Sequence, residues 1–130
     1  TSYFFEALIH LSGMSATSGN FTFSLVGAGT ATFTSCKWFA TGFDSSTPGT
    51  TGASSASLSA SATGSGDIVV AAAGTAVAVY ITGIARIAAA GTLVPSVGLT
   101  TGIAATVEQN TFLRLRPVGA NTTASVGAWS

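Results

Sequence analysis

The sequence predicts an all-β protein, a single antiparallel β-sandwich that is jelly-roll-like and built from eight to ten short strands. Three observations predict this fold. Apolar and polar residues alternate with a period of two in many short segments, Gly-rich turns separate these segments, and signals for helices are nearly absent. The chain of 130 residues has the length of one domain, so residues 1–130 are expected to share one core.

Three strands are expected in the first third of the chain. Residues 3–11 place their odd-numbered residues on one face, and residues 21–25 alternate Phe and Leu with Thr and Ser. The third expected strand covers residues 31–39. Its alternation predicts Phe33 and Phe39 on one side and Trp38 on the other.

Residues 42–66 consist almost entirely of Gly, Ser, Thr and Ala, which is typical of flexible loops. Within them, residues 55–62 alternate strictly and predict a weak strand. Apolar strands are expected again from residue 67 on, and an extended tail is expected over residues 119–130. The strands expected between these two regions cover residues 67–73, 76–82, 84–89, 92–97, 104–107 and 111–116.

Three details of this second half bear on the fold. Residues 76–82 and 84–89 are either two strands or one long strand with a bulge at Gly83. Pro95 lacks a backbone N–H, so its strand is expected at the edge of a sheet. Residues 68–85 approach the length of a membrane-spanning helix, but the alternation within them indicates strands instead.

Charge limits the partners of the protein. Charged residues make up 6% of the chain with a net charge of zero, against about 25% in an ordinary soluble domain. Nothing therefore attracts nucleic acid or an anionic membrane over a distance, and neither is an expected partner. The 47% of hydrophobic residues and the mean hydropathy of +0.58 argue against a disordered chain. Because zero net charge favours association, much of the surface is expected to be buried against copies of the chain or another protein.

Few residues are suited to catalysis or metal binding. The chain has one His, one Cys and four carboxylates, without the spacing of a zinc site. Glu6 and His10 share a strand face but lie about 13 Å apart, too far for one catalytic pair. The nucleophile motif Gly-x-Ser-x-Gly does not occur, and residues 26–29 lack the third Gly of a dinucleotide fingerprint. We therefore expect no enzyme activity, no catalytic residue, no metal and no cofactor.

Arg114 and Arg116 alternate with Leu113 and Leu115, so the two arginines share one face of their strand. They form either a cationic ladder for a ligand or subunit, or pairs with scarce acids such as Glu6 or Glu108, and the pairing is favoured. The residues expected at a subunit interface are Glu6, His10, Phe112, Arg114 and Arg116.

The aromatic residues Trp38, Phe39 and Phe43 cluster before the Gly-rich region. If exposed, Trp38 and Phe43 would suit contacts with a sugar ring. If buried, they are the largest core residues of an Ala-rich protein, and this second interpretation is favoured. The single Cys36 is expected to be a small buried hydrophobic residue.

Several segments resemble small β-sandwich domains in the virion proteins of tailed bacteriophages. The resemblance rests on the order of YFFEALI (residues 3–9), FTFSL (21–25), YITGIA (80–85), AGTL (90–93), TFLRLRPVG (111–119) and VGAWS (126–130). It covers most of the chain except residues 42–66.

This resemblance implies a jelly-roll-like, usually trimeric knob of the virion without catalytic residues. It predicts a homotrimeric capsid decoration (cement or head-fibre) protein that contacts the major capsid protein or other virion proteins. The alternative is a tail-fibre or tail-tip domain that binds a glycan on the host surface.

Overall fold

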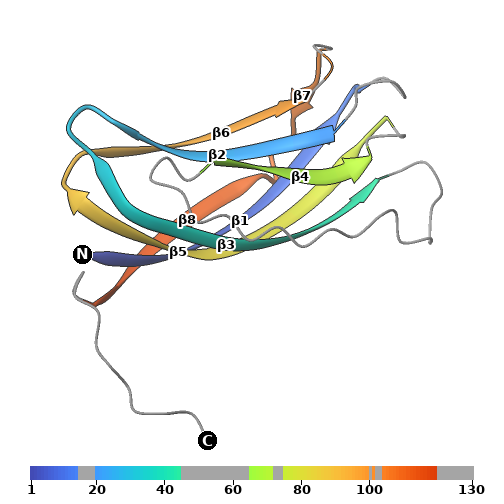
Figure 1. Cartoon of the computed structure of the whole chain (residues 1–130). Coiled ribbons are helices and arrows are strands. Elements are labelled where there is room, and N and C mark those ends of the chain that lie inside the picture. Colours follow the sequence, from blue (N-terminus) through green and yellow to red (C-terminus); the bar gives the residue numbers. More distant parts are fainter. Residues whose placement is uncertain (15–19, 45–64, 72–74, 100, 102–103, 120–130) are drawn as a thin grey trace, which may run out of the picture.

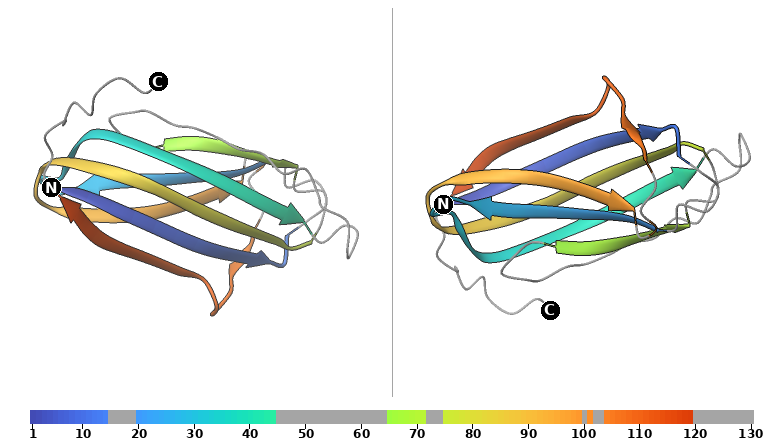
Figure 2. Two further views of the ribbon diagram at one scale, coloured as in Figure 1. Left: turned by 90° about the horizontal axis from the view of Figure 1, so that it is seen from below. Right: turned by 90° about the horizontal axis from the view of Figure 1, so that it is seen from above.

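The computed structural model describes residues 1–14, 20–44, 65–71, 75–99, 101 and 104–119, and every regular element in these residues is a strand. The strands form two antiparallel sheets that pack face to face (Figures 1 and 2). The predicted all-β sandwich is therefore confirmed. The described residues form eight strands, but three of these, at 11 to 13 residues, are longer than the short strands expected. The strands are β1 (Ser2–Ser12), β2 (Asn20–Ala28), β3 (Thr32–Asp44), β4 (Ser65–Ala71), β5 (Val77–Ala89), β6 (Thr92–Leu99), β7 (Thr106–Val107) and β8 (Phe112–Gly119).

The larger sheet has five strands in the order β3-β5-β1, with β7 and β8 sharing the far edge of β1. The smaller sheet has three strands in the order β4-β2-β6. From β1 to β7, consecutive strands belong to alternate sheets, so the chain repeatedly crosses the core (Figure 1). Strands that are distant in sequence therefore lie side by side, above all β1 between β5 and β8.

The core lies between the two sheets and follows the alternation of the sequence. Residues 5, 7, 9 and 11 of β1 are buried, as are residues 21, 23 and 25 of β2. Phe23 of the small sheet stacks on Phe5 with ring centroids 6.5 Å apart and meets Trp38 edge-on at 5.8 Å. Offset-stacked and edge-to-face rings are the favourable geometries for aromatic pairs, so these three rings bridge the sheets.

The predicted faces of β3 are wrong at Phe39. Phe33 is buried, but so is Trp38, whereas Phe39 is 49% exposed. The cause is a bulge: Phe33 pairs with Ile87 and Ser35 pairs with the adjacent Arg86, so β3 contains one extra residue, Thr34. An extra residue reverses the facing of every later position in a strand that alternates with period two.

The other expectations for the strands are mostly confirmed. β5 is one long strand, and its register with β1 and β3 is unbroken at Gly83, so the bulge considered there is absent. Pro95 lies in β6 at the edge of the small sheet, as its missing N–H requires. Residues 68–71 belong to β4 and residues 77–85 to β5, and no helix in the described residues is long and apolar enough to cross a membrane.

The structure contradicts both predicted bounds of the loop region over residues 42–66, and residues 45–64 lie outside the described residues. Residues 42–44 continue β3, and residues 65–66 begin β4. Residue 119 likewise ends β8 rather than beginning the tail. The weak strand expected over residues 55–62 and the tail over residues 120–130 lie outside the described residues.

Cys36 is fully buried, and this burial raises the pKa of its thiol from 9.0 to about 11. Because the thiolate is the reactive form, the native thiol is expected to react with Ellman's reagent at pH 8 at least ~100-fold more slowly than the urea-unfolded chain, the factor that two pKa units impose. Absorbance at 412 nm follows the reaction. Equal rates in the two states would contradict the burial of Cys36, and the variant C36A provides the blank.

Candidate functional site

The candidate interface residues meet on the outward face of the five-stranded sheet. Glu6 on β1 lies opposite Arg114 on β8 and Thr82 on β5. Directly paired residues of antiparallel strands point to the same side of a sheet, so this register fixes which side chains are neighbours. The row before it contains Arg116, Phe4, Ile84 and Lys37, and the row after it contains Phe112, Leu8, Tyr80 and Thr41.

All four basic residues of the chain belong to this one face. Lys37 and Arg116 end the same row, Arg114 lies one row further, and Arg86 lies two residues after Ile84 on the same strand. Lys37, Arg114 and Arg116 are exposed, and Arg86 is half-buried. We call the region of Lys37, Arg86 and Arg116, with Ile84 and Phe4 between them, the cationic end.

Large apolar side chains occupy the other part of the face. Phe39 is 49% exposed, and Tyr80 and Phe112 are each 42% exposed, with half-buried Leu8 between the last two. We call these four residues the aromatic end. Contiguous exposed apolar surface of this kind typically marks an interaction site on a soluble protein.

The predicted pairing of arginine with a scarce acid is confirmed for Arg114. Its guanidinium Nη2 lies 2.5 Å from Glu6 Oε1, with the Glu6 side chain 13% exposed and the Arg114 side chain 66% exposed. Arg116 instead lies over the Phe4 ring, 4.9 Å from its centroid, which is cation–π geometry. The second acid considered, Glu108, accepts a hydrogen bond from the Ser12 hydroxyl.

The ion pair is expected to add little stability because Arg114 is largely exposed to solvent. A double-mutant cycle of E6Q and R114Q in urea unfolding is expected to give a coupling free energy of about 0.2–1 kcal/mol. Salt screens such a pair, so the coupling should decrease in 1 M NaCl. A coupling that is unchanged by salt would show that the two side chains do not interact through charge.

His10 lies on β1 in the row after Leu8, and its backbone forms hydrogen bonds with the segment that precedes β8. Its N–H donates to Thr111 Oγ1 at 2.9 Å, and its carbonyl accepts from the Glu108 N–H at 2.9 Å. Glu6 and His10 lie two rows apart on this face, separated by the row of Leu8. The structure therefore brings Glu6, Phe112, Arg114, Arg116 and His10 to one face, without placing Glu6 beside His10.

Of the two residues considered for glycan contact, Trp38 does not lie on the outward face of the five-stranded sheet. Trp38 is 1% exposed among core residues, so its ring has no face open to a sugar. Its indole Nε1 has no hydrogen-bond partner among the described residues. Phe43 pairs with Ala78 near the end of β3, and its side chain lies outside the described residues.

The residues expected at a subunit interface do not include three of the four residues of the aromatic end, Leu8, Phe39 and Tyr80. The alternation of residues 3–11 puts Leu8 on the same face as Glu6, and that of residues 76–82 puts Tyr80 opposite Val77 and Val79, so these two signals were available. Phe39 could not be found in this way because the bulge before it reverses its face.

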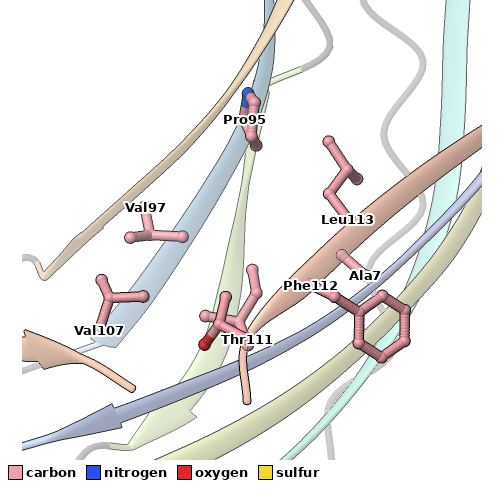
Figure 3. A pocket seen from close by; sticks show the side chains of 8 residues that line it. Ala7, Pro95, Val97, Val107, Thr111, Phe112 and Leu113 are labelled. Carbon is pink, nitrogen blue, oxygen red and sulfur yellow. The ribbon is translucent and has the colours of Figure 1, made fainter. Parts of the chain in front are cut away.

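A second feature is an apolar cavity of about 250 Å³ between the edge strands β6 and β8 (Figure 3). Pro95 and Val97 line it from the small sheet, and Leu113 lines it from the large one. The sandwich is therefore incompletely closed along this side. Among the described residues, no three His, Cys, Asp or Glu side chains lie close enough to hold a metal ion.

No family model matches the chain, and neither do any curated proteins or solved structures. The function therefore has to be argued from the outward face of the five-stranded sheet and from the sequence.

Proposed function

We propose that the protein is a non-catalytic structural protein of a tailed-bacteriophage virion, a homotrimer that decorates the capsid through contacts with the major capsid protein. The aromatic end carries this proposal, because Phe39, Tyr80 and Phe112 are each more than 40% exposed in the single chain. The virion and the trimer are suggested by the sequence segments that resemble small β-sandwich domains of virion proteins.

A neighbouring copy of the chain is the occupant we propose for the aromatic end. With charged residues at only 6% and a net charge of zero, the single chain has little charge to keep exposed aromatic rings dispersed in water. A closed ring of identical subunits hides such a surface in every copy at once. The interface residues expected from the sequence, including Phe112 and His10, belong to the same face.

The oligomeric part of the proposal is tested by light scattering coupled to size-exclusion chromatography. The wild-type protein is expected at three times its chain mass of 12.7 kDa. Y80E places a charge in the aromatic end and is expected to give monomers. V94E is the matched control, because Val94 has the same 42% exposure on the small sheet. A monomeric wild type, or a Y80E protein that remains trimeric, would overturn the proposed interface.

The virion part is tested by the copy number in purified particles, from gel densitometry against the major capsid protein. A copy number comparable to that of the capsid protein is the expected result for decoration. Only a few copies per particle would overturn decoration in favour of the alternative, a tail-fibre or tail-tip domain. Absence from purified particles would overturn both.

A further inference from the structure

The cationic end contains an open depression of about 330 Å³ between β3 and β5. Two basic side chains, two hydroxyl side chains and one apolar side chain line it: Lys37, Arg86, Thr34, Ser35 and Ile84. Its volume is at the lower end of the ~300–1,000 Å³ typical of small-molecule sites. The depression is thus comparable in size to a small ligand such as a sugar residue.

The bulge in β3 creates this combination of side chains. In a regular strand, Thr34 and Ser35 would point to opposite faces of the sheet. The extra residue at Thr34 lets both side chains line the same depression. Ser35 is paired with Arg86, and Lys37 follows two residues later on the same face. The feature that displaced Phe39 outward therefore also brings two hydroxyls beside two cations.

We infer that this depression binds an acidic sugar residue of a glycan. Lys37, which is exposed, would bind the carboxylate through a charge-assisted hydrogen bond, and the Arg86 guanidinium in the same depression adds positive charge. The hydroxyls of Thr34 and Ser35 match the hydroxyls of the sugar, and Ile84, 38% exposed, offers an apolar surface to the face of the ring. This inference stands whether or not the proposed role in the capsid holds.

The row of outward side chains that begins at Lys37 suits a glycan in which the carboxylates of successive acidic sugars lie apart from one another. From Lys37 the row runs through Ile84 and Phe4 to Arg116, and three strand spacings make it about 14 Å long. Lys37 and Arg116 end this row, and the Arg116 guanidinium lies over the Phe4 ring, so Ile84 is the uncovered apolar side chain between the two cations. Each strand of nucleic acid carries a charge about every 3.4 Å, a closer spacing than that of two cations separated by an apolar strand. A chain in which acidic and uncharged sugars alternate matches the wider spacing better.

The test is a titration of the full chain with a hyaluronan hexasaccharide, which alternates glucuronate with an uncharged sugar. Binding is measured by calorimetry in 50 mM NaCl, with the neutral chitin hexasaccharide as the ligand control. We expect the acidic ligand to bind at least about tenfold more tightly, and 500 mM NaCl to weaken it, because charge pairs contribute its selectivity.

Two variants locate the binding site. K37Q removes an exposed cation from the depression and is expected to weaken binding of the hexasaccharide about fivefold or more. R114Q is the matched control, because it removes the same charge from the same face outside the depression, and binding should change less than twofold. The circular dichroism melting curve of each variant shows whether it is folded.

Four results would overturn the inference. The first is no binding of the acidic hexasaccharide at 10 mM, and the second is equal affinity for the neutral one. The third is equal loss in K37Q and R114Q, which would indicate attraction by the whole face rather than a site. The fourth is tighter binding of inorganic phosphate, which would make the depression a general anion site.

Discussion

The variant W38A is expected to lose about 3–5 kcal/mol of unfolding free energy, the range measured for removal of large buried aromatic side chains. Trp38 is 1% exposed and meets the Phe23 ring of the opposite sheet edge-on. Alanine would leave a cavity where the two sheets are bridged. Because domains are typically stable by only about 5–15 kcal/mol, urea unfolding should show a large shift of the midpoint.

Phe39, the residue after Trp38, provides the control, because the bulge at Thr34 decides which of the two side chains points into the core. Phe39 is 49% exposed in the single chain, so F39A, compared with W38A in the Y80E background that removes the proposed subunit interface, is expected to change stability by less than about 1 kcal/mol. Without the bulge, Phe39 would point inward with Phe33, and the order of the two variants would be reversed. A larger loss in F39A than in W38A would therefore contradict the register of β3.

A third variant, W38F, separates packing from the indole nitrogen. Phenylalanine keeps an aromatic ring toward Phe23 and removes an Nε1–H that has no hydrogen-bond partner among the described residues. An unsatisfied buried donor is costly, so its removal offsets part of the lost volume. We expect a smaller loss of stability in W38F than in W38A, in the same urea experiment.

The sequence predicted the fold class and the faces of β1 and β2 because these depend on local alternation. It did not predict the faces of β3 beyond Phe33. The bulge at Thr34 is defined by pairing with Ile87 and Arg86, some fifty residues away, and the segment TFTS contains no Gly to mark it. One extra residue is enough to exchange Trp38 and Phe39 between core and surface.

The candidate site was likewise predictable from the sequence only in part. Arg114 and Arg116 could be placed on one face from their own strand, and Glu6 could be named as a partner because acids are scarce. Lys37 and Arg86 could not be joined to them, since only the order β3-β5-β1 with β8 brings all four cations together. The cationic end is therefore a consequence of topology, which local sequence does not encode.

Gly83 is the second position where a small change is expected to have a large effect. It lies in the middle of β5, paired with Phe5 on one side and Trp38 on the other. A Cβ atom there would lie 2.5 Å from the Lys37 carbonyl oxygen, 2.6 Å from Trp38 Cβ and 2.8 Å from Phe5 Cε1. Two of these atoms belong to β3 at or next to its backbone, so they cannot move without shifting the strand.

The variant G83A is therefore expected to lose about 1–3 kcal/mol of unfolding free energy by overpacking, and the larger G83V more. The matched control is G98A on the edge strand β6, where the added Cβ would lie within 4 Å of one atom of the described residues, the Thr22 side-chain oxygen at 2.9 Å. A hydroxyl at the end of a side chain can rotate away, and alanine restricts the unfolded chain more than glycine does. G98A is thus expected to be neutral or slightly stabilising, and urea unfolding compares both. A G83A protein as stable as G98A would contradict the close approach of β3 and β5 in this structure. It would also show that Trp38 does not need a glycine at position 83 in order to pack into the core.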